Sequence, residues 1–204
     1  MLIVISAEKC IENEESQLKS MFDAGLETLH IRKPEVSFEE LKTWLENFEP
    51  GYRSKMVLHQ HHGLVREFGL KGIHLPEYFR ANLKENLDDY ITSFKQEKFT
   101  VSTSVHQKEM LSETSNFDYC FLSPVFNSIS KTGYSGKKFQ VNDIQQQVIA
   151  LGGIDSAKIP LAYNMGFSGA ALLGAVWQQE NPTNSFIKIQ QHYESVFRKK
   201  ADDF

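Results

Sequence analysis

Residues 148–176 read V-I-A-L-G-G-I-D-S-A-K-I-P-L-A-Y-N-M-G-F-S-G-A-A-L-L-G-A-V and contain the unit from which the fold can be predicted. The first seven residues form an apolar run, and a second apolar run, 169–176, closes the stretch. Between the runs, Asp155 or Ser156 suits a helix N-cap and Gly166 suits a helix end. Both runs have strand length and are apolar throughout, which is typical of parallel strands buried on both faces.

This strand-then-helix unit recurs along the whole chain. Eight such units at a spacing of roughly 25 residues predict a (β/α)8 TIM barrel of the α/β class. A doubly wound open sheet is the alternative, but it requires a glycine-rich turn after the first strand, where this chain has S-A-E-K-C. The sixth unit is the weakest, since V-N-D-I-Q-Q-Q leaves room for barely two helical turns. The eight predicted strands are 2–6, 28–32, 56–59, 72–75, 99–105, 119–125, 148–154 and 169–176.

Helix signals fill the segments between these strands. Ser37 with Glu40 three residues later forms a predicted capping box. The segment 13–25 begins with acidic residues and ends in glycine, as the helix dipole favours. With no linker or low-complexity tract in the sequence, we predict one domain over residues 1–204.

Composition excludes several classes of protein. The 204 residues are 41% hydrophobic and 24% charged, as in an ordinary globular domain. A net charge of −4 makes nucleic acid and anionic membranes poor partners. Met1 leads directly into L-I-V-I-S without a basic region, so no signal peptide is predicted. The two cysteines, Cys10 and Cys120, are expected to be buried thiols in a cytoplasmic protein.

Glycines at the ends of the seventh and eighth strands are candidates for phosphate binding. Gly152, Gly153 and Gly174 would let backbone N–H groups approach an anion, and barrels often bind phosphate after these two strands. Glycine's permissive backbone serves equally well in a tight turn, which is the competing interpretation.

Cations lie at two other strand ends. Arg32 and Lys33 follow the second strand and are predicted to clamp an anion at the barrel mouth, unless they are simply solvated. The segment 126–138 combines hydroxyls, glycines and lysines, as expected for a phosphate-gripping loop or for an exposed one.

The fifth strand ends with a candidate proton-transfer residue. Ser104 and His106 are two residues apart, so their side chains point to the same side of the strand. An imidazole can accept and return a proton near neutral pH, although a histidine at a strand end is often structural.

A histidine-rich stretch, K-M-V-L-H-Q-H-H-G, occupies residues 55–63. His59 and His61 would share a side only if the strand continued, and no nearby cysteine or acidic triad completes a coordination sphere. We therefore predict no metal site here. His61 and His62 are expected to open the next helix or to line the pocket.

Six segments together resemble one family over nearly the whole chain: thiamine phosphate synthase and its TenI-type relatives. The resemblance implies an α/β barrel that acts on a thiazole phosphate or thiamine phosphate, with a possible homodimer. The synthase branch couples a hydroxymethylpyrimidine diphosphate to the thiazole phosphate with Mg²⁺, whereas the TenI branch includes a thiazole tautomerase. The matching segments are L-H-I-R-K (29–33), K-G-I-H-L (71–75), T-S-V-H (103–106), F-D-Y-C-F-L-S-P-V-F with S-I-S-K (117–131), V-I-A-L-G-G-I (148–154) and G-F-S-G-A-A-L-L-G-A-V (166–176).

The resemblance also implies roles for individual residues. Arg32 would bind the anionic substrate, while the lysine of the synthase pattern falls one place beyond Lys33, on Pro34. His59, Ser104 and Lys33 are further candidates for substrate contact. The sixth loop would contribute Ser128, Ser130 and Lys131, and backbone N–H groups of Gly153, Leu173 and Gly174 would hold the thiazole phosphate.

Two expected Mg²⁺ carboxylates are missing from this chain. The family's Asn-Asp pair falls on His59 and Gln60, and its second aspartate falls near Phe79. Because Mg²⁺ prefers oxygen ligands, Glu77 could substitute only in a rearranged loop. We therefore expect no cofactor, and Mg²⁺ only for a synthase.

These observations rank the candidate functions. A TenI-like thiazole tautomerase, an isomerase with His106 as its acid/base group, comes first. A thiamine phosphate synthase, a transferase, is the close alternative. A non-catalytic thiamine-phosphate-binding regulator comes third, and a phosphosugar isomerase barrel would leave the motifs unexplained.

Overall fold

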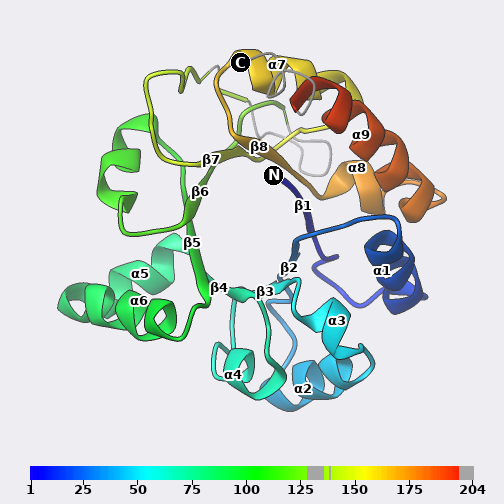
Figure 1. Cartoon of the computed structure of the whole chain (residues 1–204), viewed down its shortest axis with the longest axis vertical. Coiled ribbons are helices and arrows are strands. Elements are labelled where there is room, and N and C mark those ends of the chain that lie inside the picture. Colours follow the sequence, from blue (N-terminus) through cyan, green and yellow to red (C-terminus); the bar gives the residue numbers. More distant parts are fainter. Residues whose placement is uncertain (128–135, 138, 198–204) are drawn as a thin grey trace.

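A computed structural model describes residues 1–127, 136–137 and 139–197 of the chain. Eight parallel strands close into a barrel in sequence order, with β1 paired to both β2 and β8, which confirms the predicted fold class (Figure 1). The strands are β1 (Leu2–Ile5), β2 (Leu29–Ile31), β3 (Met56–Leu58), β4 (Gly72–Leu75), β5 (Thr100–Val105), β6 (Tyr119–Leu122), β7 (Val148–Ala150) and β8 (Gly169–Leu172).

Helices surround the barrel on the outside (Figure 1). The predicted capping box is confirmed, since Ser37 Oγ accepts from the Glu40 N–H and Glu40 Oε2 accepts from the Ser37 N–H. The helices are α1 (Glu14–Asp23), α2 (Phe38–Glu46), α3 (Pro50–Arg53), α4 (Leu64–Phe68), α5 (Glu77–Leu83), α6 (Leu87–Gln96), α7 (Ile159–Asn164), α8 (Gly174–Trp177) and α9 (Pro182–Phe197), with short 3-10 turns at Lys84–Asn86, Lys108–Thr114 and Ser156–Lys158.

Some predicted boundaries are wrong. The predicted eighth strand continued to residue 176, but it ends at Leu172 because Gly174 already begins α8. Among the described residues between β6 and β7 there is no helix, so V-N-D-I-Q-Q-Q does not form the two turns considered for it. Cys10 is exposed rather than buried, whereas Cys120 is a buried thiol as expected.

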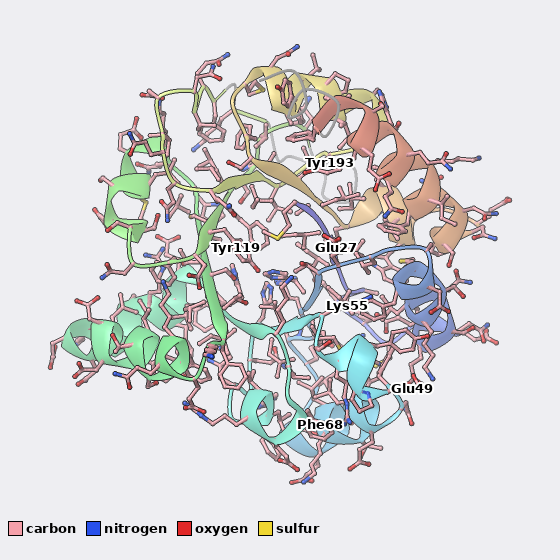
Figure 2. The ribbon with its side chains drawn as sticks, in the orientation of Figure 1. Glu27, Glu49, Lys55, Phe68, Tyr119 and Tyr193 are labelled. Atoms are coloured by element: carbon pink, nitrogen blue, oxygen red, sulfur yellow. The ribbon has the colours of Figure 1, made fainter. Side chains whose placement is uncertain are left out.

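Side chains alternate between two separate regions along every strand. Residues such as Leu29, Ile31 and Leu58 face outward and pack in one large core with the surrounding helices. Inside the barrel, β1, β6, β7 and β8 contribute a smaller apolar cluster, which includes Tyr119 (Figure 2). Several inward positions of β2 to β5 are polar instead: His30, His59 just after β3, His74 and Ser102 are all buried.

No helix within the described part of the chain has both the length and the apolar character needed to cross a membrane.

Candidate functional site

A cavity of about 740 Å³ opens at the ends of the strands where the βα loops begin. Every strand, or the loop that follows it, contributes to its wall, as expected for the functional face of such a barrel. Eight of the predicted site residues line this cavity: Arg32, His59, Ser104, His106, Gly152, Gly153, Leu173 and Gly174.

The glycine pair after β7 adopts a backbone that other residues rarely take. Gly152 has φ 96° and Gly153 has φ 67°. A Cβ atom on Gly153 would clash with the Asn127 carbonyl oxygen. The Leu151 and Gly152 carbonyls accept hydrogen bonds from residues 125 and 126, so the pair does form a tight turn against the loop after β6. This turn presents both glycines to the cavity, and Gly174 lies beside them at the start of α8.

Arg32 supplies a cation at the cavity wall. Its guanidinium forms an ion pair with Glu8, and both side chains are more than a third exposed. An anionic ligand would therefore compete with the Glu8 carboxylate for Arg32.

Lys33 does not belong to the anion clamp, and the prediction that it binds substrate is wrong. Its side chain is 1% exposed, and Nζ donates to Glu14 Oε2 at 2.7 Å and to the Ala7 carbonyl at 3.2 Å. Nζ also lies 5.4 Å from the centre of the Trp44 ring. Because Arg32 faces the cavity, its neighbour must face the helices outside.

His106 is held by its backbone surroundings at the cavity wall. Its Nδ1 lies 3.1 Å from the Ser123 carbonyl oxygen and 3.2 Å from Ser123 Oγ, so both contacts of this ring nitrogen are to one residue. The other ring nitrogen, Nε2, lies 4.0 Å from Oε2 of Glu77, which also lines the cavity. About half of each of these two side chains is exposed. The predicted pairing of Ser104 and His106 on one face is confirmed, since both line the cavity.

A cluster of three imidazoles lies at the floor of the cavity, with His59 and His74 in its lining and His30 buried behind them, and sequence reasoning missed two of its members. His30, His59 and His74 each offer a ring nitrogen, and these nitrogens lie within 4.8 Å of one another. His30 Nδ1 is 2.9 Å from His59 Nε2, and the His59 and His74 rings stack with centroids 4.1 Å apart. The sequence carries no signal for this cluster, because the register of the closed sheet brings the three residues together.

All three imidazoles are neutral at physiological pH. Burial lowers the pKa of His30 and His59 well below the usual value and lowers that of His74 to about 3. Like-charge repulsion within the cluster adds to this effect, because a proton on one ring disfavours a second.

The other histidines of the 55–63 stretch serve the fold. His61 contacts the Val36 carbonyl, and His62 is buried with Nδ1 3.0 Å from Tyr90 Oη. Their carbonyls accept from the first residues of α4, so they open that helix as expected, but neither lines the cavity.

The structure describes only part of the loop after β6. Ser128, Ser130 and Lys131 lie outside the described residues. The described Lys137 donates through Nζ to the His106 carbonyl at 3.1 Å, so this loop does reach the cavity wall.

The cavity residues do not fit Mg²⁺ as the resemblance places it. Gln60 occupies the aspartate position, and its amide nitrogen donates to the backbone carbonyls of Lys33 and Val36. Phe79, near the second position, packs against the His62 ring at 5.0 Å between centroids. His59 offers an imidazole where Mg²⁺ would prefer oxygen.

Comparisons with known proteins agree on one family. A family model described as thiamine monophosphate synthase matches residues 1–176. The thiamine-phosphate synthase of Bacteroides fragilis (strain YCH46) is 25% identical over 183 residues, covering 82% of this chain and 87% of that protein. The thiamine-phosphate synthase of Vibrio parahaemolyticus serotype O3:K6 is 32% identical over 90 residues, covering 40% of this chain and less than half, 44%, of that protein.

Solved structures give the same picture. The crystal structure of thiamine phosphate pyrophosphorylase from Bacteroides thetaiotaomicron superposes with a TM-score of 0.73 at 26% identity, covering 95% of this chain and 97% of that one. Thiamine phosphate pyrophosphorylase from Pyrococcus furiosus gives the same TM-score of 0.73 at 16% identity, which supports the fold alone.

The buried Lys33–Glu14 pair predicts a stability effect rather than a binding effect. Lys33→Met should lower the free energy of unfolding by about 3–5 kcal/mol, because it leaves the Glu14 carboxylate buried without its cation. Adding Glu14→Leu should restore most of that loss, and Lys42→Met, which removes an exposed pair, should change little in urea unfolding. If Lys33→Met has wild-type stability but binds phosphate more weakly, Lys33 belongs to the binding site after all.

The buried imidazoles predict a loss of stability in acid. In the folded protein the pKa of His62 is about 4 and that of His74 about 3, whereas unfolded histidines protonate near 6.5. Their contribution to the free energy of unfolding is therefore complete above about pH 6.5 and is lost as the pH falls toward the folded pKa. Each imidazole lowers the free energy of unfolding by up to about 1.4 kcal/mol for each pH unit in this window. We expect urea unfolding at a series of pH values to show that the free energy of unfolding falls less steeply with decreasing pH in His62→Phe than in wild type. The control variant His192→Phe, on α9, should behave as wild type does. Equal slopes would contradict the assignment.

Proposed function

Because the chain belongs to the thiamine monophosphate synthase family, we propose that it is a transferase that couples a hydroxymethylpyrimidine diphosphate to a thiazole phosphate and forms thiamine phosphate. The observation that carries this proposal is the family match over residues 1–176, which span all eight strands. The Bacteroides relatives carry the same activity in their names. They support a transferase better than the tautomerase that the sequence motifs favour.

The cavity is suited to two anionic substrates. Its volume of about 740 Å³ lies in the range of small-molecule sites, and its wall combines apolar surface with a few polar groups. We assign the thiazole phosphate to the backbone at Gly153, Leu173 and Gly174, where glycine permits close approach. Arg32 would bind the diphosphate, because a guanidinium can form two parallel hydrogen bonds to phosphate oxygens.

The coupling replaces one bond with another. A bond forms between the thiazole ring nitrogen and the methylene carbon of the pyrimidine, and the carbon–oxygen bond to diphosphate breaks. The leaving diphosphate carries away the electron pair, so cations beside its oxygens stabilise the transition state. Arg32 lines the cavity and would be one such cation once the diphosphate replaces Glu8 as its partner.

The geometry of His106 favours a second candidate, the thiazole tautomerase. Proton transfer needs a titratable group at the cavity, and His106 lines it with Nε2 4.0 Å from Glu77 Oε2. An isomerisation has no diphosphate leaving group, so the absence of aspartates at the expected positions would not impair it. The synthase and tautomerase hypotheses use the same phosphate site but different reacting groups.

The coupling reaction should be detectable directly. Purified protein with both phosphorylated precursors and divalent metal is expected to form thiamine phosphate, measured by fluorescence after oxidation. Arg32→Ala should lower the rate roughly 10- to 150-fold, since a hydrogen bond to a charged group contributes about 1.5–3 kcal/mol. Arg66→Ala is the matched control, because Arg66 pairs with Glu97 away from the cavity. Binding of thiamine phosphate without any turnover would favour the regulator instead.

His106 can be tested separately with the thiazole carboxylate phosphate tautomer. If the chain is an isomerase, His106→Ala should lose at least about a hundredfold in rate while still binding product, as expected for a general acid/base. His192→Ala, which alters a histidine bonded to Ser156, serves as control. A near-wild-type rate in His106→Ala would eliminate His106 as the proton-transfer group.

A further inference from the structure

We propose that His30, His59 and His74 form a binding site for a divalent first-row transition metal, with Zn²⁺ as the ion that fits best. The three residues project inward from β2, from the end of β3 and from β4, which are neighbours in the barrel. This site is independent of the coupling reaction, and the transferase enters only when we consider what the metal would bind.

The spacing of the ring nitrogens is close to that of a metal site. Three nitrogens at 2.0–2.1 Å from one Zn²⁺ in tetrahedral geometry lie about 3.3 Å apart. The ligand atoms here lie within 4.8 Å of one another, and one pair, His30 Nδ1 and His59 Nε2, is already 2.9 Å apart. Binding would require the stacked His59 and His74 rings to turn so that all three lone pairs meet at one ion, which would replace the hydrogen bond between His30 and His59.

The remaining ring nitrogens of His30 and His74 lie beside neighbouring hydroxyls. His30 Nε2 lies 2.7 Å from Tyr119 Oη, and His74 Nδ1 lies 3.0 Å from Ser102 Oγ. A metal-binding histidine usually has its second nitrogen fixed in this way, because the outer hydrogen bond sets the tautomer and the ring orientation. His30 would therefore bind through Nδ1 and His74 through Nε2.

The charge state of the cluster suits a metal rather than a proton. Burial keeps the rings neutral, and the neutral imidazole is the form that binds metals. None of the three ligands is a carboxylate, so a bound ion would keep both of its positive charges in a buried site. That charge is best balanced by an anionic oxygen in the fourth position.

The fourth position can face the cavity. His59 and His74 both line it, so the ion would lie at its floor with one side open to ligands. Three histidines with one open position are typical of catalytic zinc, whereas Mg²⁺ prefers oxygen ligands. If the chain is the proposed transferase, a diphosphate oxygen would bind at the open position. The ion would then supply the positive charge that Mg²⁺ held by the missing aspartates would have supplied.

The competing hypothesis is a stack of imidazoles that only fills the barrel and shares protons. Calorimetry on chelator-treated full-length protein, titrated with Zn²⁺ alone, separates the two. We expect one equivalent to bind, and Co²⁺ in its place to give the visible absorption band of a tetrahedral complex. His59→Asn and His74→Gln should each weaken Zn²⁺ binding at least about a hundredfold, since even outer-shell changes cost 10–100-fold.

His192→Gln, outside the cluster, is the matched control and should bind Zn²⁺ as wild type does. Circular dichroism should show that each variant is folded, and His74→Gln keeps a polar group near Ser102 if His59→Asn fails to fold. Absence of binding by folded wild-type protein, or equal affinity in the cluster variants and the control, would overturn the proposal. Because this readout needs no substrate, it is independent of the coupling assay: a metal-binding protein without coupling activity would refute only the transferase.

Discussion

The alternation of side chains in a closed barrel is the constraint on which the rest of this structure depends. Each strand points every second residue into an interior shared by all eight strands, and the others into the core beneath the helices. Arg32 and Lys33 illustrate this constraint, since adjacent residues reach the cavity and the buried Glu14 respectively. The same rule brings His30, His59 and His74 together, because neighbouring strands offer their inward positions to the same small volume.

The barrel interior separates charge by depth. At the wall and mouth of the cavity, Arg32, Glu8 and Glu77 are partly exposed and can exchange partners with a ligand. At the floor, burial keeps the imidazoles neutral, and the hydroxyls of Tyr119 and Ser102 contact the outer nitrogens of His30 and His74. An anion entering from the mouth would therefore meet the charged side chains first and the neutral imidazoles of the floor afterwards.

The sequence predicted the strands well, because a nearly continuous apolar run of strand length is typical of a parallel strand buried on both faces. It also placed Arg32, Ser104, His106 and the glycines correctly at one face, since parallel strands end together. Lys33 was misplaced although alternation alone argued against it, because two adjacent cations looked like one clamp. His30 and His74 were missed for a different reason: no sequence separation indicates that residues on three strands converge, which requires the register of the closed sheet.

The histidine cluster changes what family membership implies for the chemistry. A transferase that releases diphosphate needs positive charge beside the leaving oxygens, and carboxylate-bound Mg²⁺ would supply it in the resembling synthases. Here the position of the Asn-Asp pair is occupied by His59 and Gln60, and the Gln60 amide is already bonded to backbone carbonyls, so this position offers no carboxylate to Mg²⁺. Two sources of positive charge remain within the described cavity: Arg32, once released from Glu8, and an ion held by the three imidazoles. An isomerase needs neither source, so a metal at the floor of the barrel would contribute to the reaction only in a transferase.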